Sequence, residues 1–221
     1  MKKSLIVIDD FYEDPYKVRQ YAFSQNFNNP SYVTGYPGVE TNSLEPEKIK
    51  HIAKRISSII GKKLGWPPDR PQGVFRVLQK QEEKTQTNLV HIDPCSWTGV
   101  VYLNLPEECR GGTSFYQHKE TGLKVMFPQK NPEVQQAMVK YNLSYHELSA
   151  KTLKDTLDLS KWDEIERVSM KFNRLILFNG GKFHGVPRVF GNTLATGRIA
   201  QIFFFFEIES IDEDGNMTIP V

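Results

Sequence analysis

Residues 197–208 read GRIAQIFFFFEI, and this stretch indicates the fold more clearly than any other part of the chain. Its residues are mostly β-branched or aromatic, and such side chains favour strands. A run this apolar, almost without alternating polar residues, is typical of a strand that is buried on both faces. We therefore expect residues 199–208 to form a strand in the interior of a sheet.

Further strands are predicted upstream of this run. Short apolar segments bounded by turn residues place them at 5–8, 74–79, 89–92, 100–105, 114–117 and 174–179. The pairs Gly111-Gly112 and Gly180-Gly181 mark turns in this series. The chain from residue 74 onward is therefore expected to be rich in strands.

Helices are predicted mainly in the first third and in one later segment. They cover residues 16–23, 46–60, 132–141 and 145–157. The pairs Asp14-Pro15 and Asn131-Pro132 each join an N-cap residue to a proline at the first helical position. Isoleucines at three- and four-residue spacing give the helix at 46–60 one apolar face, which predicts that it packs on a sheet. His51 is expected to be an exposed residue of that helix.

The order of these elements predicts one mainly β domain with flanking helices over residues 1–221. An N-terminal helical buttress is expected at about 10–70, a strand-rich core at about 74–208, and a helical insert in that core at about 118–170. This order favours a barrel or jelly roll with helices packed outside. Segment 26–42, which contains Tyr32, Tyr36 and Pro37, is predicted to be an irregular surface connection rather than a lid.

Composition excludes several classes of protein. A formal net charge of +2 does not favour binding to nucleic acid or to an anionic membrane. Two cysteines, Cys95 and Cys109, do not make a disulfide framework. The apolar run at 5–8 is too short for a signal peptide, and the sequence has no apolar stretch of about 18 residues that would span a membrane. We therefore expect a cytoplasmic protein.

A possible metal site lies in the segment LVHID at 89–93. Residues two apart on a strand point to the same face, so His91 and Asp93 are expected to point to one place. His184 follows the apolar strand at 174–179. Two histidines and one carboxylate form the facial triad of iron(II) oxygenases, which leaves three positions for a bidentate 2-oxo acid and for O₂. The HxD pattern often occurs by chance, and on that pattern alone a hydrogen-bonded histidine inside a barrel is the favoured explanation of His91.

Arg198 lies at the start of the predicted buried strand. A dicarboxylate bound inside a barrel needs a cation at its distal end, and a guanidinium grips a carboxylate at two points. The phenol of Tyr102 is placed to donate a second hydrogen bond to that carboxylate. The alternative for Arg198 is an edge position in solvent or a salt bridge.

These residues resemble those of the 2-oxoglutarate and iron(II)-dependent dioxygenases, and more closely the prolyl-4-hydroxylase-like branch, over about residues 75–206. The family's HxD matches His91 and Asp93, and its distal metal histidine matches His184. Its carboxylate-binding arginine matches Arg198. The family's Y-L-N strand, its GG turn and its H-x-V correspond here to Tyr102 and Asn104, to Gly111 and Gly112, and to Val186.

The resemblance implies a double-stranded β-helix, which is a jelly-roll barrel, with Fe(II) as metal and 2-oxoglutarate and O₂ as co-substrates. It implies hydroxylation of an unactivated C–H bond with release of succinate and CO₂. Halogenases of this superfamily carry a small residue at the position of Asp93, so the carboxylate favours hydroxylation. Asn104 and Ser114 are candidates for contact with co-substrate or substrate, although packing roles explain them equally well.

The sequence departs from the family pattern in two ways. The arginine usually follows the distal histidine by nine or ten residues, whereas Arg198 follows His184 by 14 (198 − 184), which predicts a longer turn at 188–196. Arg188 is too close to His184 to be a good substitute. The insert at 118–170 is also long, so the substrate of the prolyl hydroxylases does not carry over. Its histidines, His118 and His146, are expected to lie on the surface.

Two other functions remain open from the sequence. A cupin-type metal enzyme also uses two histidines and a carboxylate in a jelly roll, but it has no need of Arg198. A degenerate barrel that binds ligand without turnover is the second alternative. A free amino acid, a peptidyl side chain and another small molecule all remain possible substrates, and the sequence does not indicate the oligomeric state.

Overall fold

The structure is a computed structural model that describes residues 4–30, 38–67, 70–80, 90–211 and 217–219. Tyr32, Tyr36 and Pro37 of the predicted connection and Leu89 of a predicted strand lie outside these residues. The helices are α1 (Pro15–Ser24), α2 (Pro46–Ile60), α3 (Pro132–Tyr141) and α4 (Tyr145–Leu153). The strands are β1 (Leu5–Ile8), β2 (Asn29–Pro30), β3 (Val39–Glu40), β4 (Leu64–Gly65), β5 (Val74–Leu78), β6 (Trp97–Tyr102), β7 (Gly112–His118), β8 (Trp162–Ser169), β9 (Leu175–Phe178), β10 (His184–Gly185), β11 (Arg198–Glu207), β12 (Ser210–Ile211) and β13 (Met217–Thr218).

Strand β11 lies in the middle of the larger sheet, as its sequence predicts. The sheet has eight strands in the order β1-β9-β6-β11-β5-β3-β2, and β4 pairs with the end of β11. All the pairings of β11, with β4, β5 and β6, are antiparallel. Because both of its edges are hydrogen-bonded and both faces are covered, an almost wholly apolar sequence is the one that suits this strand.

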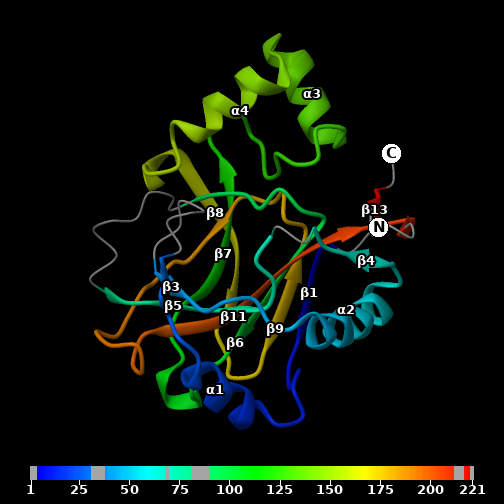
Figure 1. The fold of residues 1–221 in the computed structure, drawn as a ribbon. Coiled ribbons are helices and arrows are strands. Elements are labelled where there is room, and N and C mark those ends of the chain that lie inside the picture. The colour runs from blue at the N-terminus through cyan, green and yellow to red at the C-terminus, as the bar shows by residue number, and fades with distance from the viewer. Residues whose placement is uncertain (1–3, 31–37, 68–69, 81–89, 212–216, 220–221) are drawn as a thin grey trace.

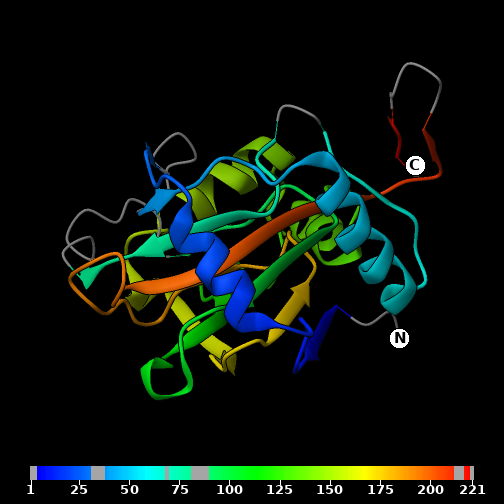
Figure 2. The same cartoon turned by 60° about the horizontal axis from the view of Figure 1, so that its bottom comes forward.

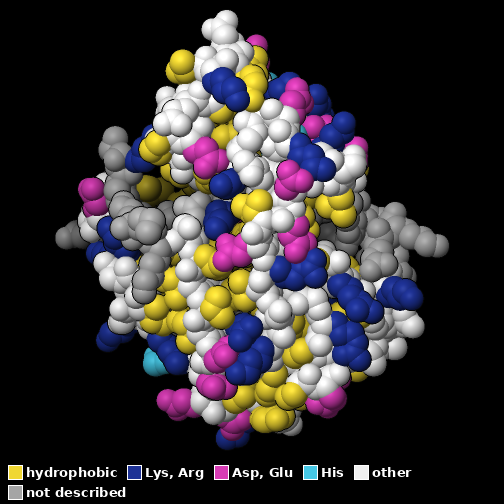
Figure 3. Space-filling view, turned by 180° about the vertical axis from the view of Figure 1, so that it is seen from behind, with side chains coloured by type: hydrophobic (Ala, Val, Ile, Leu, Met, Phe, Trp, Pro, Cys, Tyr) yellow, Lys and Arg dark blue, Asp and Glu magenta, His cyan; other side chains and the backbone are white. Residues whose placement is uncertain are grey.

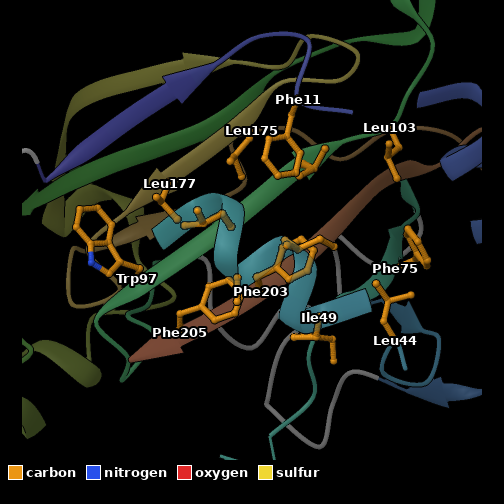
Figure 4. Packing of buried hydrophobic residues seen from close by; sticks show 14 of the residues in the cluster. Phe11, Leu44, Ile49, Phe75, Trp97, Leu103, Leu175, Leu177, Phe203 and Phe205 are labelled. Atoms are coloured by element: carbon orange, nitrogen blue, oxygen red, sulfur yellow. The ribbon is translucent and has the colours of Figure 1, made fainter. Parts of the chain in front are cut away.

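The outer face of the large sheet is covered by α1 and α2 (Figure 2). Ile49, Ile52 and Ile56 of α2 are buried in a cluster with Phe203 and Phe205 of β11. Figure 4 shows this packing around α2, with Phe203 and Phe205 of β11 directed toward the helix. The isoleucine face of α2 therefore packs on the sheet, as its spacing predicts. Gly61 ends the helix in the left-handed conformation that glycine favours.

The inner face of the large sheet packs against a second, three-stranded antiparallel sheet in the order β10-β7-β8. The apolar cluster between the two sheets includes Val100, Ile176 and Ile202 from the large sheet and Phe115 and Val168 from the small one. Along β11, residues facing this cluster alternate with those facing the helices. Two facing antiparallel sheets with helices outside confirm the mainly β prediction.

The segment expected to be a helical insert contains more than helices. Helices α3 and α4 begin at the predicted residues, because Asn131 accepts from the backbone N–H of Glu133 and Ser144 forms a capping box with Glu147. However, α4 ends at Leu153, and the following chain forms strand β8. Because most residues of β8 are exposed, its sequence has no apolar run that would predict a strand. Figure 1 shows α3 and α4 together beyond the small sheet, far from α1 and α2.

Two other local predictions differ from the structure. Of the strand predicted at 89–92, the described part forms only an isolated bridge at His91, so it is not a ladder strand. Segment 26–42 is not wholly irregular, since β2 and β3 pair there in antiparallel fashion.

The surface agrees with the composition. In the view of Figure 3, lysine and arginine side chains lie interspersed with aspartate and glutamate, in keeping with the net charge of +2. Among the residues that the structure describes, no helix has both the length and the apolar character that a membrane crossing requires.

We expect Phe203→Ala to lower the free energy of unfolding by about 3–5 kcal/mol, because it opens a cavity between β11 and α2. Phe203 is fully buried, and its ring stacks on Phe205 at a centroid distance of 5.8 Å. Urea unfolding monitored by circular dichroism measures the loss. Val139→Ala is the control, because Val139 is 82% exposed and should change stability by no more than about 0.5 kcal/mol. Equal effects of the two variants would contradict this packing.

Candidate metal centre

The main chain brings two of the predicted metal ligands together. The backbone N–H of His91 donates to the carbonyl of His184, and that of His184 donates to the carbonyl of His91, both at 2.9 Å. This bridge holds the two imidazole rings 4.2 Å apart between centroids. His184 is also anchored on its other side, because β10 pairs with Phe115 and Ser114 of β7.

The third ligand, Asp93, is held beside them by its own backbone. Its N–H donates to the carbonyl of Gly180 at 2.7 Å. A side chain at residue 180 would clash with the backbone of Asp93, since an added Cβ would lie 2.5 Å from its carbonyl oxygen. The Gly180-Gly181 pair, predicted only as a turn, therefore also permits this close approach.

The donor atoms of the three side chains converge. His91, Asp93 and His184 each offer one atom, and these atoms lie within 4.8 Å of one another. An Asp93 carboxylate oxygen, Oδ2, lies 3.3 Å from Nε2 of His184, while Oδ1 lies 4.0 Å from Nε2 of His91. The Nδ1 atom of His184 donates to the carbonyl of Lys182 at 2.8 Å, which leaves Nε2 as the atom that faces the carboxylate.

The protonation of these groups suits a cation. Burial and the neighbouring His184 lower the pKa of His91 to about 3, against the opposing effect of the Asp93 carboxylate, so the His91 imidazole is neutral at neutral pH. Burial alone would raise the pKa of Asp93, but His184, His91 and a hydrogen bond from Thr98 together hold it well below its usual range. An ionised carboxylate beside a neutral imidazole is the state in which both groups bind a metal.

The donor set fits a divalent transition metal. Two imidazole nitrogens and one carboxylate oxygen are borderline and hard donors, and a 2-His-1-carboxylate set is characteristic of non-haem iron(II). His91, Asp93 and His184 also line one cavity, and the side chains of His91 and Asp93 remain 18% and 16% exposed to solvent. Ligands from outside the protein therefore have access to the centre.

Arg198 and Val186 line the same cavity, as expected. Arg198 is buried, which excludes the alternative of an edge residue in solvent. Its guanidinium lies 5.5 Å from the centroid of the Tyr102 ring and donates weakly to the carbonyl of Gly112 at 3.5 Å. The longer turn predicted before it is present, since the hydroxyls of Thr193 and Thr196 close it at 2.9 Å.

Tyr102 stands between the two sheets at the arginine end of the cavity. It is fully buried on β6, and its hydroxyl shares a hydrogen bond of 2.8 Å with the hydroxyl of Thr113. Burial raises the pKa of Tyr102, so the phenol keeps its proton and remains a donor. Tyr102 is not among the residues that line the cavity, and its hydroxyl contacts that lining through Thr113, so its predicted hydrogen bond to a co-substrate carboxylate stays a prediction.

Asn104 and Ser114 are not among the residues that line the cavity. The side chain of Asn104 donates to the carbonyl of Gly197 and accepts from the N–H of Ile199, at 2.9 and 2.8 Å. It thereby fixes the backbone on both sides of Arg198. Ser114 faces away from the cavity and accepts from Arg167 of β8 at 3.2 Å. The structure therefore gives both residues supporting roles.

Three residues with polar or charged side chains line the cavity without having been predicted from the sequence: Arg76, Thr98 and Thr113. The hydroxyl of Thr98 donates to Oδ2 of Asp93 at 2.7 Å. Thr98 lies four residues before Tyr102 on β6, so the period-two alternation of that strand would have placed it on the inner face. It was missed because the strand was predicted to begin at residue 100 and in fact begins at Trp97.

The surface prediction for the insert histidines holds for His146, which is exposed, and is wrong for His118. His118 is fully buried, with Thr121 at 2.9 Å from Nδ1 and Asp155 at 3.0 Å from Nε2. The pairing with Asp155 could not be predicted from the sequence, because the two residues are 37 positions apart. Glu120 brings a further carboxylate close to this pair, but it is paired with Lys151 and Lys154.

Fold and site together define a mainly antiparallel β protein with a centre of two histidines and one carboxylate in a cavity that a buried arginine also lines. The chain belongs to the family DUF6445, described as a family of unknown function, whose model matches residues 1–205. Among curated proteins, no match to the chain is found.

Solved structures with a similar fold include HygX from Streptomyces hygroscopicus with nickel, 2-oxoglutarate and hygromycin B bound. The likeness covers 100% of this chain and 91% of HygX, at 13% identity and a TM-score of 0.50. A prolyl-4-hydroxylase from Pseudomonas putida is matched over 93% of this chain and 94% of its own, at 12% identity and a TM-score of 0.40. At these identities the comparison concerns the fold, and the prolyl-4-hydroxylase-like branch stays a prediction.

We expect Thr98→Val to weaken Mn(II) or Fe(II) binding by about 10- to 100-fold, because Asp93 loses the hydroxyl that orients it. Anaerobic calorimetric titration of the metal measures the change. Thr113→Val is the matched control, since Thr113 lines the same cavity but bonds to Tyr102. It should leave metal affinity unchanged. If the two variants bound metal equally well, Thr98 would have no role in orienting the carboxylate.

Proposed function

We propose that this protein is an Fe(II)- and 2-oxoglutarate-dependent dioxygenase that hydroxylates an unactivated C–H bond and releases succinate and CO₂. The observation that carries the proposal is the presence, in one cavity, of the His91, Asp93 and His184 centre together with the buried guanidinium of Arg198. A metal centre alone would serve many reactions, but a guanidinium that lines the same cavity is suited to grip the distal carboxylate of a dicarboxylate co-substrate at two points. The likeness in fold to HygX, whose structure holds 2-oxoglutarate, supports the same assignment.

We also propose that the two facing sheets form the double-stranded β-helix, or jelly roll, of that superfamily. In support of this, the metal ligands come from the small sheet (His184) and from the segment leading into β6 (His91 and Asp93), while Arg198 begins the central strand of the large sheet. The cavity thus lies between the two sheets, which is where a jelly roll binds its ligands.

The residues of the cavity have different roles in the proposed reaction. His91, Asp93 and His184 would hold the iron, which when bound supplies the capacity to activate O₂. Arg198 pairs with the distal carboxylate of 2-oxoglutarate, and Asn104 holds the backbone around Arg198 in place. Val100, Ile202 and Phe204 line the cavity with apolar surface, which limits water around the reacting groups.

Arg198 also separates this proposal from the alternative of a cupin-type enzyme. An enzyme without an anionic co-substrate has no need of a guanidinium that lines the cavity of its metal centre. The alternative of a degenerate barrel is disfavoured because all three ligand side chains converge and Thr98 still orients Asp93.

We expect the purified protein, supplied with Fe(II), 2-oxoglutarate and O₂, to release succinate, slowly without a primary substrate. Succinate is measured by mass spectrometry. Asp93→Ala should abolish the release, because it removes the only carboxylate ligand of the three. No succinate from the wild-type protein with any candidate substrate would refute the proposal.

We expect Arg198→Ala to weaken 2-oxoglutarate binding by at least about tenfold, since a hydrogen bond to a charged group is worth about 1.5–3 kcal/mol. Calorimetric titration into the Mn(II)-loaded protein gives the affinity without turnover. Arg188→Ala is the control, because Arg188 is exposed and does not line the cavity. A loss of affinity in Arg188→Ala, with none in Arg198→Ala, would transfer the role to Arg188.

A further inference from the structure

The pairing of β6 with β11 stops at Ala200 and does not reach Arg198. The side chain of Asn104, which follows β6 along the chain, takes over from the strand. Its amide donates to the carbonyl of Gly197 at 2.9 Å and accepts from the N–H of Ile199 at 2.8 Å. A side-chain amide therefore continues the hydrogen-bond ladder on both sides of Arg198, the residue assigned to the co-substrate.

Only one orientation of the Asn104 amide makes both bonds. The N–H of Ile199 is a donor, so it needs the side-chain oxygen, whereas the carbonyl of Gly197 is an acceptor and needs the NH₂ group. A flipped amide would bring donor against donor and acceptor against acceptor. A group that fixes the orientation of this amide therefore also fixes the backbone that carries Arg198.

Glu108 is the group that fixes the amide. Its Oε2 atom accepts from Nδ2 of Asn104 at 3.4 Å, from the N–H of Leu105 at 3.0 Å and from Nη2 of Arg19 at 3.3 Å. An ionised carboxylate only accepts hydrogen bonds. Glu108 therefore favours the NH₂ group of Asn104 on its side and disfavours the oxygen, which is the orientation that β11 requires.

Arg19 links Glu108 to helix α1. Besides its contact with Glu108, its Nε donates to the carbonyl of Leu103 at 3.0 Å. The side chains of Arg19 and Glu108 are only 17% and 28% exposed, so this ion pair is screened less by salt than a fully exposed pair would be. Helix α1 lies on the outer face of the large sheet (Figure 2), and the contacts lead from it to the arginine that lines the cavity.

We propose that Glu108 is a positioning residue for Arg198, that it acts through Asn104, and that Arg19 holds it in place. The inference rests on the proposed function, in which Arg198 grips the distal carboxylate of 2-oxoglutarate. A two-point grip depends on the direction of the guanidinium plane, so a small shift of the backbone at residues 197–199 weakens it. Helix α1 is thereby part of the co-substrate site, although no residue of this fully described helix lines the cavity.

The test compares two 2-oxo acids that differ only at the distal end. 2-Oxopentanoate carries a methyl group where 2-oxoglutarate has its second carboxylate, so only 2-oxoglutarate can use Arg198. Both acids are titrated calorimetrically into the Mn(II)-loaded protein, which does not turn over, and Mn(II) is titrated into the metal-free protein. The variants are Glu108→Ala and Glu108→Gln, which keeps an acceptor oxygen. Glu107→Ala is the matched control, because Glu107 belongs to the same short turn, 106–108, and is exposed.

We expect Glu108→Ala to weaken 2-oxoglutarate binding by about three- to tenfold, which corresponds to the usual net value of one hydrogen bond. Its affinities for 2-oxopentanoate and for Mn(II) should not change, because neither ligand reaches Arg198. Glu108→Gln should lie between Glu108→Ala and the wild type. Glu107→Ala should match the wild type for all three ligands.

A double-mutant cycle separates positioning from a general loss of stability. In the Arg198→Ala background, Glu108→Ala should weaken 2-oxoglutarate binding no further, because the side chain that Glu108 positions is gone. A general effect of Glu108 on the fold would persist in that background.

The inference is overturned if Glu108→Ala binds 2-oxoglutarate as the wild type does, if it weakens both 2-oxo acids equally, or if its effect is undiminished in the Arg198→Ala background. Failure of the proposed function gives different results. In that case the wild-type protein binds no 2-oxoglutarate, or Arg198→Ala binds it as tightly as the wild type.

Discussion

The structure depends above all on two reciprocal backbone hydrogen bonds between His91 and His184. The residues are 93 positions apart (184 − 91), and no local preference would bring them together. Because the bonds are made by the main chain, the side chains are positioned whether or not a metal is present. The pairing of β10 with β7 and the contact of Asp93 with Gly180 extend the same constraint to the small sheet and to the third ligand. The centre is therefore part of the folded framework.

The sequence predicted those parts of the fold that are governed by local chemistry. The starts of α1 and α3 were predicted from Asx-Pro pairs, and the burial of β11 from its phenylalanines, because capping and apolar runs act over a few residues. Strand β8 was missed, since its exposed face carries polar residues and its only apolar contacts are at the ends. Propensity cannot identify a strand whose pairing with β7 comes from tertiary packing.

The same distinction applies to the site. His91, Asp93, His184 and Arg198 were found from spacing and from the apolar context of Arg198, and the structure brings all four to one cavity. Asn104 and Ser114 were indicated by proximity in sequence to Tyr102 and to the turn at Gly112, and they turned out to face elsewhere. Thr98 was missed because it lies before the predicted start of its strand, and Arg76 because the pairing of β5 with β11 is what shows that it faces inward.

The bridge between His91 and His184 has a consequence for protein engineering. Since the backbone fixes the positions of these residues, the chemical nature of each ligand can be exchanged while its location is retained. A cysteine introduced at position 91 or 184 would present a softer donor than histidine, and a carboxylate a harder one, from the same fixed backbone position. The chain thus offers a small scaffold for artificial metalloproteins, in which the preference among metals is set by one side chain at a time.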